Sequence, residues 1–359
     1  MRILFALCLA LPALAATNRT VTVKPSGGDY TSLAAAVAGE EKNLVSLDRQ
    51  LTIECYAKQD TTAVVFERTA WTTDATRYIL VTAPAGERHA GVYDTSKYRL
   101  EVSGNWPLRI HHGVFITVEY LQIYLTGNPS SNWRVLYLGA PTNSASNITI
   151  RNNIIRTGGD FNNQGVIHSS NTGNASTNVY IYNNLIYGGA GTNTYGFQTD
   201  IAGNYYLWNN TVGSGANGMR RNAAGVVVAV NNLLNVSTAA ATGTFAAGTN
   251  SNATNRSSMG YTVTGGGNTS DRVSQTFTFV DAGAADYHLS EADTGARNAG
   301  IADPGSGAFG YDIDGEPRYG LWDIGADEFP SAGRRRNIVI ASRGNIAAGG
   351  GQTGQKEWK

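Results

Sequence analysis

The side chains best suited to chemistry lie in three short segments with a common pattern: GVIHSSN (165–171), GFQTDIA (196–202) and GMRRNAA (218–224). Each segment begins with a glycine, and aligning the three glycines as successive strands brings equivalent residues within about 5–10 Å of one another. This alignment places Gln198 beside Arg220, and His168 in the next column beside Arg221. The predicted site comprises His168, Gln198, Asp200, Arg220 and Arg221, with Tyr195 next to them.

These side chains match the needs of polysaccharide β-elimination. That reaction requires a base at C5 of a uronate sugar and a positive group that neutralises its carboxylate. His168, Arg220 and Arg221 suit those roles, and Asp200 would orient an arginine or hold Ca²⁺. The predicted catalytic residues are therefore His168, Asp200, Arg220 and Arg221, and the predicted substrate-binding residues are Gln198 and Tyr195.

Two other interpretations of this region differ in their chemistry. Glycoside hydrolysis usually needs two carboxylates, about 5 Å or about 6.5–9.5 Å apart, and the region offers only Asp160, Asp200 and the distant Glu119. A purely structural interpretation pairs Asp200 with the two arginines as surface charges. Because this region contains no acidic cluster that would bind Ca²⁺, no metal and no cofactor are predicted.

The elements that must position these residues repeat along the chain. Four segments share an alternating apolar run, an Asn-Asn pair and a second short apolar run; they are NITIRNNIIRTGG (147–159), VYIYNNLIYGG (179–189), YYLWNNTVGSG (205–215) and VVVAVNNLLNV (226–236). Their Asn pairs begin 31, 26 and 22 residues apart, at Asn152, Asn183, Asn209 and Asn231. VFITVEYLQIYLTG (114–127) is an earlier copy without the pair.

This period predicts a parallel solenoid, in which each coil stacks about 4.8 Å above the last. Asparagine suits the turns because it tolerates a left-handed backbone and can hydrogen-bond to its copies above and below. Charged side chains cannot stack in this way without repulsion, and residues 113–270 contain no lysine and only three acidic residues. A β-sandwich is the rival fold, but it provides no reason for Asn pairs to recur.

Composition supports an all-β protein and excludes several classes. Lys plus Arg and Asp plus Glu each total 27, so no global field favours nucleic acid. Hydrophobic residues make up 42% of the chain, which is enough for a large core and excludes a disordered chain. After removal of a leader, Cys55 would be the single cysteine, so no internal disulfide is predicted.

The Asn-marked coils resemble the right-handed parallel β-helix of the pectate-lyase-like superfamily. VTVKPSGGDYTSLAAAVA (21–38) is similar to the amino-terminal strand and helix cap of such proteins. DYHLSEADTGARNAG (286–300) and DIDGEPRYGLWDIGADEF (312–329) resemble the carboxy-terminal segment of secreted and phage-encoded members. The resemblance implies the fold and both caps over about residues 21–330. It implies no single activity, because the superfamily holds lyases, hydrolases, epimerases, tailspikes and adhesins.

The chain divides into five predicted parts. Residues 1–15 read as a signal peptide, with one arginine, an apolar run too short to span a bilayer and a small-residue cleavage site. The others are an N-terminal cap with the first coils (16–112), the β-helix core (113–270), a C-terminal cap (271–330) and a basic Gly-rich tail expected to be disordered (331–359).

Two further motifs have structural interpretations. Asp312-Ile313-Asp314-Gly315 resembles the start of a Ca²⁺ loop, but the rest of that motif is missing. We expect Asp312 or Asp314 to pair with Arg318 and hold the cap. His111 and His112 would point to opposite faces of a strand, so they would not share a metal.

The sequence therefore predicts an exported or virion-associated β-helix protein that binds an acidic polysaccharide and cleaves it by β-elimination. The alternative is a non-catalytic structural or adhesive rod, such as a phage tail or surface protein, that assembles into trimers. Neither interpretation includes stable insertion into a membrane. They differ in their coils, because a catalyst needs clustered ionisable groups whereas a scaffold needs only ladders.

Overall fold

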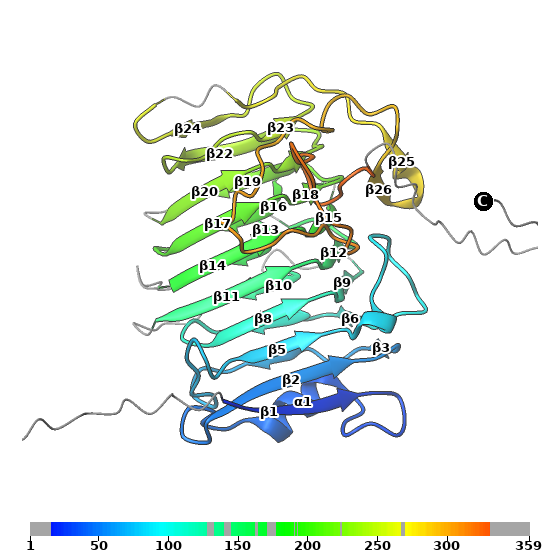
Figure 1. Ribbon diagram of the computed structural model, residues 1–359, viewed down its shortest axis with the longest axis vertical. Helices are drawn as coiled ribbons and strands as arrows, with labels where there is room; N and C mark the ends of the chain where they lie inside the picture. The colour runs from blue at the N-terminus through cyan, green and yellow to red at the C-terminus, as the bar shows by residue number, and fades with distance from the viewer. Residues whose placement is uncertain are drawn as a thin grey trace, which may run out of the picture. The chain divides into compact units, whose positions relative to one another are not determined.

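The computed structural model describes residues 16–330, except residues 128–132, 140–144, 162–163, 171–176, 190, 192, 223–224 and 267–269. The predicted leader (1–15) and the predicted tail (331–359) lie outside the described residues. Within the described part, the strands form three parallel sheets of eight strands each (Figure 1).

Each sheet takes one strand from each coil. Sheet 1 contains β1 (Thr17–Val23), β2 (Arg49–Cys55), β5 (Ile79–Thr82), β8 (Phe115–Glu119), β11 (Ser146–Arg151), β14 (Thr177–Tyr182), β17 (Asn204–Trp208) and β20 (Val226–Val230). Sheet 2 contains β4 (Val64–Phe66), β7 (Leu108–Ile110), β10 (Leu136–Leu138), β13 (Gln164–Ser169), β16 (Thr194–Thr199), β19 (Asn217–Arg221), β22 (Ala239–Phe245) and β24 (Tyr261–Val263). Sheet 3 contains β3 (Gln59–Asp60), β6 (Arg99–Ser103), β9 (Gln122–Thr126), β12 (Ile154–Thr157), β15 (Leu185–Gly188), β18 (Thr211–Val212), β21 (Leu233–Leu234) and β23 (Ala253–Thr254).

From β2 to β22, consecutive strands of the chain visit sheets 1, 3 and 2 in turn, which is the path of a parallel β-helix. The predicted all-β solenoid is therefore confirmed. The coils begin at β1, so the change in composition near residue 113 marks no structural boundary. Among the described residues, none of the helices combines the length and apolarity needed to cross a bilayer.

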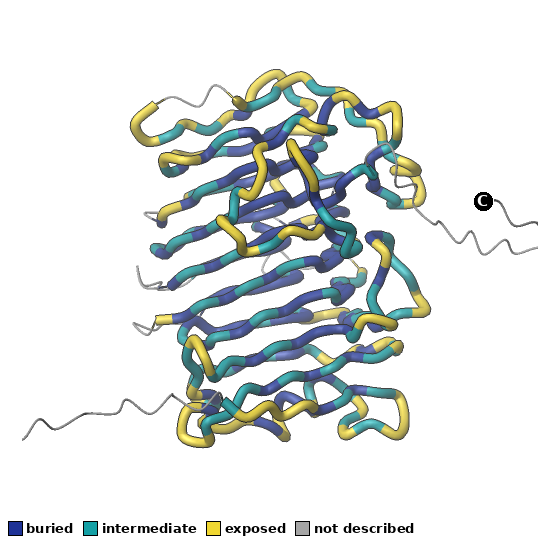
Figure 2. Tube along the Cα trace, viewed as in Figure 1, coloured by how far each residue is buried: buried dark blue, intermediate teal, exposed yellow. Residues whose placement is uncertain are grey.

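The core lies inside the coils, and buried residues alternate with less buried ones along many of the strands (Figure 2). In β14, Val179 and Ile181 are buried while Tyr180 between them is partly exposed. Parallel register stacks these inward residues on their equivalents, so that Val179 lies between Ile148 and Tyr205. Burial of this continuous apolar column is the main force that stabilises the coils.

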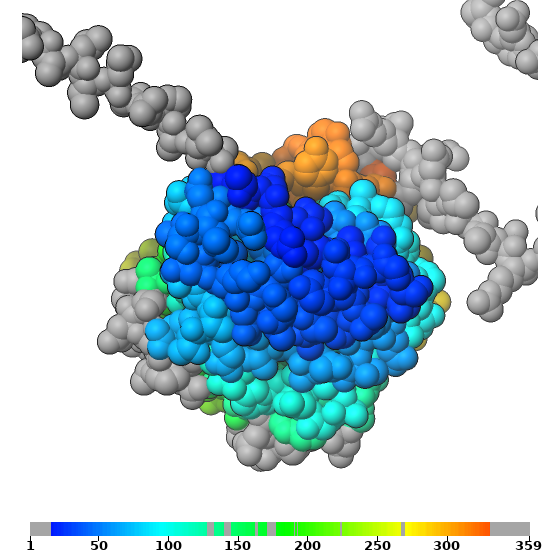
Figure 3. Space-filling model, turned by 90° about the horizontal axis from the view of Figure 1, so that it is seen from below, coloured from blue at the N-terminus to red at the C-terminus, as the bar shows by residue number. Residues whose placement is uncertain are grey.

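The predicted N-terminal cap is present. Helix α1 (Leu33–Glu40) follows β1, and the hydroxyl of Ser32 accepts a hydrogen bond from the amide of Ala35 at 3.1 Å, which caps the helix. Its buried face includes Leu33, Ala36 and Val37, as the apolar spacing predicts. Residues at this end of the chain close the first coil (Figure 3).

The two members of each Asn pair have different roles. The first asparagine adopts the left-handed backbone, with φ near 50° at Asn152, Asn183, Asn209 and Asn231. The second forms the ladder, since each backbone amide donates to the side-chain oxygen of the next at 3.0–3.1 Å; the ladder runs through Asn153, Asn184, Asn210, Asn232 and Asn252. Tyr120 and Ser251 take the same left-handed position, so the copy at 114–127 is confirmed and Ser251-Asn252 is a further copy that sequence reasoning missed.

The first asparagines fasten the C-terminal segment to the coils. The side-chain amides of Asn183, Asn209 and Asn231 donate to the backbone carbonyls of Tyr311, Asp323 and Ile301 at 2.6–3.0 Å. The segment predicted as a C-terminal cap therefore runs back along the side of the coils, shown in orange in Figure 1.

This course of the chain has a physical reason. The segment forms the antiparallel pair β25 (Phe279–Asp281) and β26 (Asp286–Leu289), with the short helix η2 (Ala282–Ala284) between them. The other short helix, η1 (Ala85–Glu87), lies between β5 and β6. Its apolar residues cover side chains that the coils would otherwise expose; Tyr287 and Ile313 pack on Leu185, and Phe309 packs on Trp208.

The expected ion pair of Arg318 with Asp312 or Asp314 is wrong. Arg318 pairs with Glu328 at 3.0 Å. The carboxylate of Asp312 instead accepts the backbone amides of Asp314, Glu316 and Glu328 at 2.7–3.2 Å. Asp312 therefore shapes a turn, as short acidic side chains often do.

Candidate functional site

The predicted site lies on the outer face of sheet 2. Strand register places Arg109 of β7, Tyr137 of β10, His168 of β13, Gln198 of β16 and Arg220 of β19 in one column across the sheet. Neighbouring members are one strand apart, so the column from Arg109 to Arg220 spans about 19 Å. The repeats thus build a row of polar and aromatic side chains parallel to the solenoid axis.

The predicted alignment of β13 is wrong by one residue. Gly165 lies opposite Tyr195 and not Gly196, so His168 faces Gln198 and not Thr199. The reason is burial, because Ile167 must join Phe197 inside the coil and a shift of one residue would turn it outward. The alignment of β16 with β19, which pairs Gln198 with Arg220, is confirmed.

His168 is fully buried and both of its ring nitrogens are engaged. The Nε of Arg134 donates to its Nδ1 at 2.9 Å, and its Nε2 lies 2.9 Å from Oδ2 of Asp200. Because a guanidinium can only donate, the imidazole must be neutral, with its proton on Nε2. Burial lowers the pKa of His168, and the charge of Arg134 lowers it further, against the hydrogen bond to Asp200. His168 therefore connects Arg134 to Asp200 and keeps no free lone pair.

Asp200 is the acidic group at the exposed end of the hydrogen-bonded series that runs from Arg134 through His168. Its side chain is 31% exposed, and the amide of Gln198 donates to both carboxylate oxygens at 2.9 and 3.1 Å. Burial raises the pKa of Asp200, but the hydrogen bonds from His168 and Gln198 outweigh that effect and lower the pKa below its usual value. Asp200 is consequently ionised at neutral pH.

The two consecutive arginines point in different directions. Arg220 lies 5.0 Å above the ring of Tyr195, and its guanidinium donates to Asn222 at 3.4 Å. Arg221 donates to the backbone carbonyls of Gly225 and Thr244. Among the described residues, neither arginine forms an ion pair with Asp200. The structure therefore joins Arg220 to the site, and it gives Arg221 a role in tying coils together.

Sequence reasoning missed the half of the row that lies nearer the N-terminus. The rings of Trp106 and Tyr137 are 4.7 Å apart, and the guanidinium of Arg109 lies 5.3 Å from Trp106. The guanidinium of Arg134 lies 5.4 Å from the centre of the Tyr137 ring. These coils lack the Asn pair, but the parallel segments NWPLRI (105–110) and NWRVLY (132–137) would have been a usable signal.

The row is positively charged and rich in aromatic rings. Its described charges are three guanidinium groups, of Arg109, Arg134 and Arg220, against the one carboxylate of Asp200. The Nε atom of Arg109 is buried without a hydrogen-bond partner among the described residues. Tyr137, His168 and Gln198 are buried, so the accessible surface of the row consists of the half-buried arginines and Asp200 together with the rings of Trp106 and Tyr195. Such a surface favours an anionic ligand with flat apolar faces.

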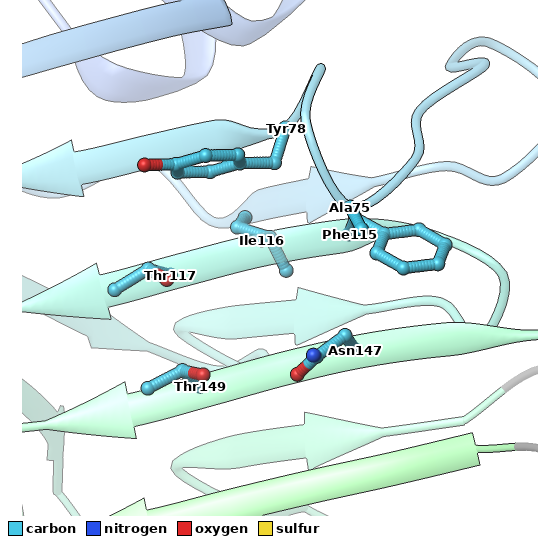
Figure 4. Close-up of a pocket in the computed structure, with 7 residues that line it drawn as sticks. All are labelled: Ala75, Tyr78, Phe115, Ile116, Thr117, Asn147 and Thr149. Atoms are coloured by element: carbon cyan, nitrogen blue, oxygen red, sulfur yellow. The ribbon is translucent and has the colours of Figure 1, made fainter. Parts of the chain in front are cut away.

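A separate hollow on sheet 1 has different chemistry. It has a volume of about 140 Å³ and is lined by uncharged side chains, including Tyr78, Phe115, Thr117, Asn147 and Thr149 (Figure 4). The described residues that line it include no arginine, lysine, histidine, aspartate or glutamate, so they supply no charged partner for a carboxylate. The row on sheet 2 is therefore the better candidate site.

The side chains of His111 and His112 have different surroundings, as their predicted opposite orientations imply. His111 lies 3.0 Å from the carboxylate of Glu67, whereas His112 is fully buried and its Nε2 lies 3.5 Å from the Ser169 hydroxyl behind the site. Burial lowers the pKa of His112 to about 4.

Stability should therefore depend on pH through His112. A histidine with a lowered pKa contributes stability that is complete above its ordinary value of about 6.5 and is lost as the pH falls toward 4. Between pH 7 and 5 the wild-type protein should lose about 2 kcal/mol more unfolding free energy than His112→Leu. Urea unfolding of both proteins at each pH measures this difference, and parallel pH profiles would contradict it.

Comparison of the chain with known protein families finds no match, and comparison with curated proteins finds no match either. The assignment of function therefore rests on the site itself.

Proposed function

We propose that the row on sheet 2 binds an acidic polysaccharide along the solenoid axis. The observation that carries this proposal is the register that places Arg109, Tyr137, His168, Gln198 and Arg220 in one column. Guanidinium groups bind carboxylates through paired hydrogen bonds, and aromatic rings stack on the apolar faces of sugars. A span of about 19 Å accommodates several sugar units.

Cleavage of the bound polymer by β-elimination is the second candidate function. One arrangement favours this function. Asp200 is ionised and partly exposed, and a series of hydrogen bonds connects it through the buried His168 to Arg134. In this reaction a base takes the proton from C5, the C4–O bond breaks, a C4=C5 double bond forms and the leaving oxygen gains a proton.

The roles of the residues follow from their exposure. Asp200 would accept the C5 proton. Arg220 would bind the carboxylate of the uronate and stabilise the negative charge that spreads onto it from C5 in the transition state. His168 would act as a positioning residue, since Arg134 and Asp200 occupy both of its nitrogens. Gln198 would hold Asp200, and Tyr195 would support Arg220.

Arg220→Ala and Arg221→Ala form a matched test, since the two residues are adjacent and carry the same charge. We expect Arg220→Ala to weaken binding of polygalacturonate or alginate at least tenfold with little change in stability. Arg221→Ala should lower the melting temperature and leave binding intact, because its guanidinium bonds to backbone carbonyls. Titration calorimetry measures binding, with a neutral polysaccharide as the control ligand.

The same variants test cleavage through the absorbance of the unsaturated product. Asp200→Asn should abolish product formation while polymer binding remains. If Arg220→Ala binds both acidic polymers as the parent does, the assignment of the binding site to the row on sheet 2 is wrong. If the parent binds them but forms no product, the protein is a binding rod and the second candidate function fails.

A further inference from the structure

A second group of ionisable side chains lies far along the chain from the row on sheet 2. His288 of β26, Asp314 and Asp327 each direct one nitrogen or oxygen atom toward a common point, and these atoms lie within 4.8 Å of one another. All three belong to the C-terminal segment that packs along the coils. His288 and Asp327 are buried, with 7% and 4% of their surfaces exposed.

The two ring nitrogens of His288 differ in their contacts. Its Nδ1 lies 2.6 Å from the Oδ1 of Asp286, which fixes the ring. Its Nε2 is buried and has no hydrogen-bond partner among the described residues, although the Oδ2 of Asp314 lies at 3.4 Å. A carboxylate that holds one nitrogen of a histidine while the other faces carboxylates is the usual arrangement around a metal ligand.

A glycine lies beside Nε2. A β-carbon built on Gly91 would lie 2.3 Å from Nε2 of His288, so a residue with a side chain would clash with the imidazole there. A small cavity of about 10 Å³ lies beside His288 and Asp327, and its wall also includes Leu185, Tyr287 and Ile313. That space is about the size required by one ion or one water molecule.

The charge of the group also favours a cation. The carboxylates of Asp286, Asp314 and Asp327 lie around the one imidazole of His288. A group with this balance of acidic side chains attracts cations.

We propose that His288, Asp314 and Asp327 bind one divalent cation of the Zn²⁺ or Mn²⁺ class. An imidazole with two carboxylates suits these ions better than Ca²⁺, which prefers oxygen ligands alone. Asp286 is a positioning residue for His288 and not a ligand. The ion would join three separated points of the C-terminal segment, beside the turn at Gly91, and so stabilise the fold of that segment.

The test uses the full-length protein after treatment with EDTA and dialysis. ZnCl₂, MnCl₂ and CaCl₂ are titrated separately by calorimetry, and metal content is then measured by mass spectrometry. We expect one Zn²⁺ or Mn²⁺ per chain with a Kd of about 10 μM or lower, weaker binding of Ca²⁺, and a higher melting temperature with the bound ion.

Asp314→Asn should weaken binding at least tenfold, and Asp286→Asn about tenfold through the orientation of His288. Glu291→Gln, which removes an exposed carboxylate three residues after His288, should bind as the wild-type protein does. Wild-type protein that binds neither Zn²⁺ nor Mn²⁺, or that prefers Ca²⁺, would overturn the proposal whether or not the variants fold. Unchanged affinity in a folded Asp314→Asn protein would overturn it equally.

Discussion

Replacing Asn184 with leucine should lower the free energy of unfolding by about 3–5 kcal/mol. Asn184 is fully buried, and its side-chain amide donates to the carbonyls of Ile150 and Tyr182 and to Oδ1 of Asn210 at 2.8–3.0 Å. Its own Oδ1 accepts the backbone amide of Asn153. Leucine would leave these buried groups unpaired, and each unpaired group costs about 1–3 kcal/mol.

The expected result is specific to the second asparagine of the pair. Asn178→Leu, on the outer face of β14 just before the Asn pair, should change stability by less than about 1 kcal/mol, because a half-buried side chain can exchange its partner for water. Asn183→Leu should instead loosen the C-terminal segment, since Asn183 donates to the carbonyl of Tyr311. Urea unfolding compares the three variants, and a loss below 1 kcal/mol for Asn184→Leu would show that the ladder does not stabilise the coils.

The second large effect is expected from Arg318→Met. The Arg318 side chain is fully buried; it pairs with Glu328 at 3.0 Å and donates to Asn183 Oδ1 and the carbonyls of Gly325 and Ala326 at 2.9–3.0 Å. Removing one partner of a buried ion pair leaves the other charge uncompensated, which costs about 3–5 kcal/mol. We expect a loss of this size at pH 8.

The loss should be smaller at pH 5. Burial raises the pKa of Glu328 to about 7 even though Arg318 opposes that effect, so removal of Arg318 would raise it further. An acid with a raised pKa contributes stability that is complete below its unfolded value, about 4.5, and is lost as the pH rises through its folded value. Protonated Glu328 therefore needs no cation, and acid should partly restore the variant.

Thermal unfolding and limited proteolysis of the C-terminal segment measure both effects. The double variant Arg318→Met with Glu328→Gln is the control, because it removes both charges and should recover much of the loss. An equal loss at pH 8 and pH 5, with no recovery in the double variant, would show that the ion pair is not the cause.

Several features of the site could be predicted because they depend on local pattern. Gln198, Asp200 and Arg220 were placed together correctly, since β16 and β19 carry the same alternation of apolar and polar residues. Arg134 and Arg109 were missed because their coils lack the Asn pair that marks the later repeats. The partner of Arg318 was mistaken because sequence proximity favoured Asp312 and Asp314 over Glu328.

The sequence by itself determined the parallel coil, its Asn turns and the helical cap, because alternation, left-handed asparagine and a capping serine act over a few residues. Tertiary structure alone decided that His168 faces Gln198, because strand register follows from burial of Ile167 against the neighbouring coils. The same register brings Arg134 and Asp200 to the two ring nitrogens of His168. Tertiary structure also decided that the C-terminal segment turns back along the coils, because that path depends on apolar surface contributed by residues more than a hundred positions away, such as Leu185 against Ile313.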